Sequence, residues 1–251
     1  IISETIIDMI CPSDPTEDPC ADPANFNNAE CEGYEPPSDD PAEDDPCASK
    51  KPKANALNGI LNNNASIASA IAATNVFGAN GQEASFRVDK NSNNTYSATS
   101  PQDFPQGQEY SSTNIGPNTI GLGHGHDNDS FPEPSPADVY GLGEANQTHP
   151  NLRFSLVTTN TENYAIYVAD PDAFATFSAA HSEASIADTT GNYNLNTAIG
   201  ADIATEGQNA YENWFAPRGL TQASATAAQI VKAEKDASET QIAYLMSHYN
   251  T

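Results

Sequence analysis

The sequence predicts a mixed α+β domain in which helices flank a β-sheet. Some segments carry apolar residues at intervals of three and four, which is typical of amphipathic helices, and others alternate apolar and polar residues, which is typical of strands. These segments follow one another as helix, strands, helix, strands and helices, and this order indicates an α+β or mixed α/β fold. The chain of 251 residues is long enough to bury a sizeable core.

The first predicted elements are a helical segment and a hairpin. Residues 54–74 have apolar side chains at helical spacing and predict one or two short helices, with the Asn run at 62–64 as the break. In residues 82–88, Ala, Phe and Val alternate with Glu, Ser and Arg, which predicts a strand. A polar turn and a return strand at 95–99 complete the hairpin.

The middle of the chain places a strand directly before a helix. Residues 118–126 predict a short apolar strand that ends on two histidines. Residues 135–138, Ser-Pro-Ala-Asp, are typical of a helix start, because Ser caps free N–H groups, Pro fits the first turn and Asp favours the positive end of the helix. Residues 152–170 predict a second hairpin.

The C-terminal part of the chain is predicted to be helical. Asp170 is the N-cap of one helix, and a second helix over 201–219 is stopped by Pro217 and Gly219. The last predicted helix is Ala-rich and covers residues 223–249. These helices are expected to pack on the mixed domain.

The N-terminal segment has a different composition. Residues 11–53 are rich in Pro, Asp and Glu and poor in aliphatic residues, so they cannot bury a core by themselves. The segment contains all four cysteines, which are Cys11, Cys20, Cys31 and Cys47. An even number at this spacing predicts two disulfides, with three pairings possible, and an oxidising compartment. We therefore expect an acidic arm over 1–53, a mixed domain over 54–182 and a helical extension over 183–251.

The charge of the chain argues against several kinds of partner. Lysine and arginine number only 9 and the formal net charge is −25, which is unfavourable for binding nucleic acid or an anionic membrane surface. No run approaches the roughly 18 apolar residues of a membrane span. Together with the predicted disulfides, this composition favours a secreted or cell-surface protein. Four Asn-x-Ser/Thr sequons are about what chance gives in so Asn-rich a chain.

Three residues of the middle segment are placed to bind a metal ion. Residues i and i+2 of a strand point to the same face, so His124 and His126 can meet one ion, and Gly125 between them removes crowding. Asp138 lies in the first turn of the next helix, where its carboxylate could turn towards the end of the strand. Two imidazoles and a carboxylate suit a catalytic Zn²⁺ site with an open position for water. Taken singly, a His-x-His pair is more often an inconsequential surface feature.

Two further residues are candidates for catalysis beside such an ion. Glu83, on the polar face of the predicted strand 82–88, could take a proton from a zinc-activated water, and Glu109 is its rival. Ser135 could donate a hydrogen bond to a developing oxyanion. Each has a simpler explanation, because Glu83 alone is an ordinary strand residue and Ser135, like Asp138, is fully explained as a helix cap.

These residues, in this order, resemble the JAB/MPN (JAMM) metallopeptidases, and most closely the bacterial secreted or toxin-associated branch. The resemblance covers residues 55–182: a strand glutamate, His-x-His, a loop, Ser-Pro-x-Asp opening a helix, and then a hairpin. It implies a cytidine-deaminase-like mixed sheet, zinc ligands at His124, His126 and Asp138, Glu83 as acid/base and Ser135 as oxyanion donor. The sequence departs from the family at Gly125, where Ser or Thr is usual.

Two functions of different classes follow. The first is a secreted zinc metallopeptidase or isopeptidase-type hydrolase that acts on a protein or peptide. The second is an extracellular structural protein, such as a filament or surface-appendage subunit, that uses an inactive or repurposed domain of this fold and assembles with copies of itself through the N-terminal arm. The short β-branched run in residues 4–10 could serve as a donated strand in such an assembly.

Overall fold

A computed structural model describes most of the chain after residue 50. The described residues are 51–103, 114–126, 133–160, 162–168 and 170–248. Residues 1–50 of the predicted acidic arm, with the cysteines and the proposed donated strand, lie outside these ranges, and so does Glu109. The predicted boundary of the arm at residue 53 is too late, because the first helix already begins at Lys51. None of the helices in the described part combines the length and apolar character that crossing a bilayer requires.

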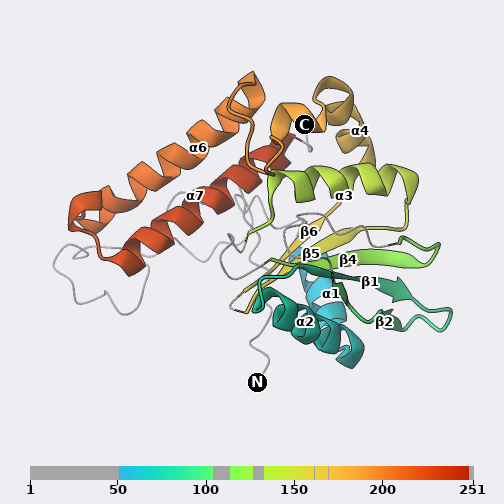
Figure 1. The fold of residues 1–251 in the computed structure, drawn as a ribbon. Helices are drawn as coiled ribbons and strands as arrows, with labels where there is room; N and C mark the ends of the chain where they lie inside the picture. The colour runs from blue at the N-terminus through green and yellow to red at the C-terminus, as the bar shows by residue number, and fades with distance from the viewer. Residues whose placement is uncertain (1–50, 104–113, 127–132, 161, 169, 249–251) are drawn as a thin grey trace, which may run out of the picture.

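Among the described residues, six strands form one mixed sheet at the centre of the fold (Figure 1). The strands are β1 (Ala84–Lys90), β2 (Tyr96–Ala98), β3 (Gln102–Asp103), β4 (Thr119–Gly125), β5 (Phe154–Thr158) and β6 (Asn163–Tyr167). Their order across the sheet is β2-β1-β4-β5-β6, and the short β3 pairs with the other end of β1. The pair β4 and β5 is parallel, whereas β1 with β4 and β5 with β6 are antiparallel. The mixed α+β class predicted from sequence is therefore confirmed.

Helices cover both faces of this sheet. On one face lie α1 (Lys51–Asn62) and α2 (Ala65–Gly78), and on the other lies α3 (Pro136–Thr148), which connects the two parallel strands (Figure 1). The remaining helical elements follow β6, and they are α4 (Pro171–Ala180), α5 (Glu183–Ile186), α6 (Ala198–Phe215), η3 (Ala216–Arg218), η4 (Gln222–Ser224) and α7 (Ala227–His248).

Each face of the sheet has its own apolar core. The core under α1 and α2 consists of Leu57, Leu61, Ile67, Ala70, Phe86, Val88, Phe154 and Leu156. The core on the opposite face joins α3 to the later helices and includes Val139, Leu142, Leu152, Ile166, Phe174, Ile186, Ile203, Ile242 and Leu245. Since a fully buried aliphatic or aromatic side chain contributes roughly 1.5–3 kcal/mol, both layers stabilise the sheet strongly.

Strand β4 alternates glycine with larger residues, and this alternation explains how closely it packs. A Cβ on Gly123 would lie 2.3 Å from the ring of Phe86, and one on Gly125 would lie 2.6 Å from Cγ2 of Thr74. Glycine is therefore required at positions 123 and 125, where β4 faces the α2 side of the sheet. The residues between the glycines point to the other face, where α3 begins.

The two longest helices, α6 and α7, pack antiparallel to each other beyond the sheet (Figure 1). A Cβ on Gly207 of α6 would lie 2.4 Å from the side chain of Gln241 on α7, so the two helices approach closely there. Trp214 and Phe215 at the end of α6 pack with Ala233 near the start of α7. Because Ile203, Ile242 and Leu245 belong to the core of the mixed domain, the C-terminal helices share that core.

The predicted boundaries shift by a few residues where local chemistry overrides the apolar pattern. The first strand covers 84–90 instead of 82–88, so Glu83 lies just before β1. The break between the first two helices falls where expected, with Asn64 as the N-cap of α2. The last helix begins at residue 227, because Thr221 and Ser224 form a capping box around a separate 3-10 turn.

Candidate metal site

Strand β4 presents both histidines to the same face of the sheet. Period-2 alternation puts His124 and His126 opposite to Gly123 and Gly125, so the imidazoles project away from the core under α2. Residue 124 is paired with Ser85 of β1 on one side and with Val157 of β5 on the other. His126 follows the last residue of β4, and its N–H donates a hydrogen bond to the carbonyl of Thr158 at 3.2 Å. The backbone that carries the two rings is therefore fixed on a central strand.

The start of α3 positions the third side chain. Ser135 is the N-cap, and its hydroxyl accepts a hydrogen bond from the N–H of Asp138 at 3.1 Å. In return, Oδ2 of Asp138 accepts from the N–H of Ser135 at 2.7 Å and from its hydroxyl at 2.8 Å. This reciprocal capping box holds the Asp138 carboxylate in one orientation, turned towards β4.

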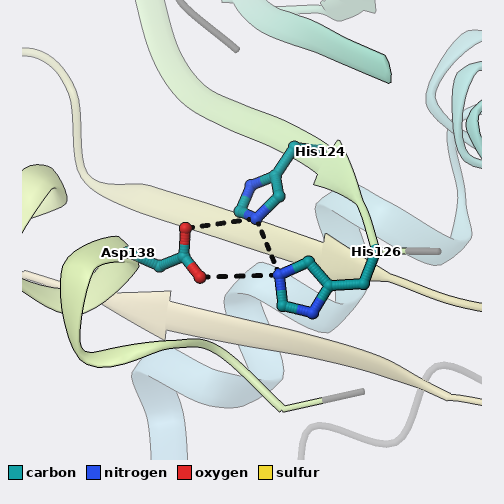
Figure 2. Close-up of side chains that lie close together, drawn as sticks. All are labelled: His124, His126 and Asp138. Carbon is teal, nitrogen blue, oxygen red and sulfur yellow. Dashed lines mark hydrogen bonds and ion pairs between the residues drawn. The ribbon is translucent and has the colours of Figure 1, made fainter. Parts of the chain in front are cut away.

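His124, His126 and Asp138 converge on one point (Figure 2). Nε2 of His124 lies 3.3 Å from Nε2 of His126 and 3.2 Å from Oδ1 of Asp138, and Nε2 of His126 lies 3.6 Å from Oδ2. With zinc–ligand bonds of about 2.0–2.1 Å, the donor atoms of a tetrahedral site lie roughly 3.3–3.4 Å apart. The separations of 3.3 Å between the two imidazoles and 3.2 Å between His124 and Oδ1 are close to this edge length, whereas the 3.6 Å separation joins His126 to the other carboxylate oxygen, Oδ2.

The described part of the chain holds no other group of this kind. Such a group consists of three or more His, Cys, Asp and Glu residues whose ligand atoms all lie within 4.8 Å of one another. In the described part of the chain, the group that meets this condition is His124, His126 and Asp138. The side chains are 14%, 11% and 21% exposed, so the group is shielded yet reachable from solvent. These three residues can therefore bind a metal ion, which confirms that part of the sequence prediction; the identity of the ion as zinc stays a prediction.

The electrostatics of the group favour an ionised carboxylate. Burial raises the pKa of Asp138, but the charge of His124 and hydrogen bonds to both imidazoles outweigh it and hold that pKa well below its usual range. An ionised carboxylate beside two imidazoles suits a divalent cation, which would bind the imidazoles in their deprotonated form.

The candidate base, Glu83, lies next to this group in register but outside it. The antiparallel pairing of β1 with β4 ends at Ser85 and His124, so Glu83 lies two residues beyond the last pair, at the end of β4 that carries the histidines. Its carboxylate is not one of the atoms that lie within 4.8 Å of one another. The position suits a residue that acts through a water molecule, and its role as acid/base stays a prediction.

The hydroxyl of Ser135 both donates to and accepts from Asp138 and so stabilises the start of α3. Its single proton is directed at Oδ2 of Asp138 and its lone pair accepts from the N–H of the same residue. In this arrangement Ser135 fixes the orientation of the Asp138 carboxylate through hydrogen bonds. The oxyanion-donor role stays a prediction, and it would require the hydroxyl to rotate away from Asp138.

One buried titratable residue near the site was missed by the sequence interpretation. Glu133, two residues before Ser135, is only 3% exposed. It lies in the segment Phe-Pro-Glu-Pro-Ser, where neither periodicity nor motif indicates burial. Only the fold shows that the loop turns this side chain inward.

No protein-family model matches this chain, and the curated proteins and solved structures that were compared with it include no match. The function is therefore inferred from the fold and from the residues of the site themselves.

Proposed function

We propose that this chain is a zinc metallopeptidase or isopeptidase-type hydrolase of the JAB/MPN (JAMM) kind. The observation that carries the proposal is the convergence of His124, His126 and Asp138 with separations of 3.2–3.6 Å. Two imidazoles and one carboxylate form a three-ligand set typical of catalytic zinc, which keeps a fourth position for water. Structural zinc sites, in contrast, are usually closed by four protein ligands.

In this proposal, some residues bind the metal ion and another transfers protons. His124, His126 and Asp138 would hold the ion, and Ser135 keeps the carboxylate of Asp138 turned towards it through the capping box. Zinc would supply an acidified water and a Lewis acid for the carbonyl of a peptide bond. Glu83 would accept a proton from the nucleophile and return it to the leaving amine.

The surrounding fold supports the same function. The catalytic candidates lie at one end of neighbouring strands, since β1 begins after Glu83 and β4 ends at Gly125. The helix that opens with Ser135 and Asp138 then crosses to β5, which lies parallel to β4. A glutamate just before β1, the histidine strand β4, the Ser-Pro-x-Asp start of α3 and a hairpin thus follow one another in the order of the family resemblance, and this order supports the proposal.

Zinc content and peptide hydrolysis test the proposal together. The purified protein is expected to bind one zinc ion per chain, His124→Ala to lose it, and His149→Ala to keep it as a matched control outside the site. Glu83→Gln is expected to retain zinc but lose hydrolysis of a peptide or isopeptide library. Stoichiometric zinc without any zinc-dependent hydrolysis would contradict the enzymatic function, and no zinc would contradict the site.

We further propose a secreted or cell-surface location, on the basis of the four cysteines and the acidic, Pro-rich composition of residues 11–53. Mass mapping of the protein under non-reducing conditions tests it, because two disulfides are expected. Four reduced cysteines in the native material would contradict this location.

A further inference from the structure

Glu133 is a buried carboxylate with one oxygen that lacks a hydrogen-bond partner. It is 3% exposed, and its Oε2 atom has no hydrogen-bond partner among the described residues. A buried polar group without a partner normally costs free energy, and native structures rarely keep one without a reason. One such reason is a ligand that supplies the missing partner.

Four other polar side chains lie near enough to Glu133 for their charges, or its own, to shift a pKa. Glu162 comes from the β5–β6 turn, Tyr164 from β6, and Lys235 and Glu239 from α7. The Lys235 ammonium lies 2.7 Å from Oε1 of Glu162 and 3.7 Å from Oε1 of Glu239. The hydroxyl of Tyr164 lies 2.7 Å from Glu162 and 3.1 Å from Glu239. We call these five residues the Glu133 cluster.

The Glu133 cluster contains more negative than positive charge. It has three carboxylates, from Glu133, Glu162 and Glu239, and one ammonium, from Lys235, so two negative charges remain when all are ionised. Tyr164 does not change the charge balance, because its phenol is neutral, and its single proton can be donated to only one of the two carboxylates beside it. Burial, as the largest cause, and then the nearby carboxylates raise the pKa of Glu133 to about 7. The cluster therefore lacks a second cation.

The spacing of the cluster suits an extended cation better than a metal ion. In the described part of the chain, these three carboxylates do not form a group whose ligand atoms lie within 4.8 Å of one another. A guanidinium or ammonium group on a side chain can instead reach several carboxylates at hydrogen-bond distance. The side chains of Glu162 and Glu239 are 36% and 22% exposed, so the cluster extends to solvent, from which a ligand can approach.

The Glu133 cluster lies near the same end of the strands as the metal site. Glu133 is two residues before Ser135, so their Cα atoms can lie about 7 Å apart at most. The β5–β6 turn that carries Glu162 begins after Thr158, whose carbonyl accepts the N–H of His126. A peptide that reaches the candidate metal site could therefore place a side chain at the cluster.

We propose that Glu133, together with Glu162 and Glu239, forms a subsite that binds the lysine or arginine side chain of a peptide beside the metal site. This inference rests on the proposed hydrolase function and names its substrate class. The net charge of −25 supports it, because a strongly acidic protein attracts cationic ligands and accelerates their association.

A binding experiment separates the subsite from the hydrolase. The probe is Nα-acetyl-arginine amide, with Nα-acetyl-citrulline amide as its neutral analogue, titrated by NMR at mildly alkaline pH into the full chain and into His124→Ala. Both proteins are expected to bind the arginine probe at least about tenfold more tightly than the citrulline probe, since charge-assisted hydrogen bonds give this preference. Glu133→Gln is expected to abolish the preference, while Glu234→Gln, which removes an exposed charge from α7, keeps it.

The outcomes distinguish the two proposals. Equal binding of the two probes, or an arginine preference that survives in Glu133→Gln, overturns the subsite. If Glu133→Gln does not fold, as judged by circular dichroism, Glu239→Gln takes its place with the same expected loss of preference, and an unchanged preference again overturns the subsite. A preserved arginine preference in a protein without zinc-dependent hydrolysis contradicts the hydrolase function and leaves the cationic subsite standing.

Discussion

Ser135 and Asp138 are joined by three hydrogen bonds, which make one carboxylate serve both a helix and a candidate metal site. Oδ2 of Asp138 accepts from the N–H and the hydroxyl of Ser135, and Ser135 accepts from the N–H of Asp138. The other oxygen, Oδ1, lies 3.2 Å from Nε2 of His124. Helix capping and ligand orientation are therefore coupled in this residue pair.

This coupling predicts a double effect for Ser135→Ala. Loss of the cap is expected to lower the free energy of unfolding by about 1 kcal/mol. Loss of the orienting hydrogen bond is expected to weaken zinc binding roughly 10–100-fold. Ser135→Thr keeps a hydroxyl and should retain most of both. Chemical denaturation and competitive zinc titration measure the two quantities, and an unchanged zinc affinity in Ser135→Ala would show that the cap does not orient the ligand.

The contact between Gly125 and Thr74 predicts an interaction between two substitutions. Gly125→Ala introduces a Cβ 2.6 Å from Cγ2 of Thr74 and is expected to destabilise the fold by about 1–3 kcal/mol. Thr74→Ser removes Cγ2, so Gly125→Ala should cost less in that background. A double-mutant cycle measured by urea unfolding tests this. Additive effects would mean that the two positions do not interact.

The raised pKa of Glu133 predicts that the free energy of unfolding decreases from acid to neutral pH. Its folded-state pKa of about 7 lies above the ordinary 4.5, so the folded protein binds the proton more tightly than the unfolded chain. Stability is therefore expected to fall as pH rises from 4.5 to 7, by roughly 3 kcal/mol for this group at about 1.36 kcal/mol per pKa unit. Urea unfolding across this range should show the decline in the native chain and a flatter profile in Glu133→Gln. Identical profiles would be inconsistent with the buried carboxyl.

The lowered pKa of Asp138 predicts that, in more acidic solution, the free energy of unfolding decreases as pH falls. Its folded-state pKa is depressed, so its contribution to stability is fully present above the unfolded pKa of about 3.9 and is lost as pH falls through the folded value. Asp138→Asn should therefore unfold with less sensitivity to acid than the native chain. An unfolding free energy that falls equally steeply in both proteins below that pH would contradict the ionised carboxylate.

Much of the fold could be predicted from the sequence because its signals are local. The alternation in β1, the break before Asn64 and the capping residues Ser135 and Asp170 each act within a few residues, and the structure places each as expected. The close packing of β4 could not be predicted, because the need for Gly125 depends on Thr74, which is distant in sequence.

The candidate metal site was predictable for the same reason, and the Glu133 cluster was not. The period of a strand places His124 and His126 on one face, and the first turn of a helix limits where Asp138 can point. Glu133, in contrast, comes under the influence of the charges of Glu162 and Glu239 only because the fold brings the β5–β6 turn and α7 near it. Neither its neighbours in sequence nor any motif indicates that proximity.

The coordination of zinc in the loaded protein tests the central claim most directly. X-ray absorption at the zinc edge is expected to show two imidazole nitrogens and oxygen donors at about 2.0–2.1 Å in a four-coordinate site, with the imidazole signal reduced in His126→Ala. A spectrum without imidazole scattering, or one that His126→Ala leaves unchanged, would contradict the assignment of His124, His126 and Asp138 as the metal ligands.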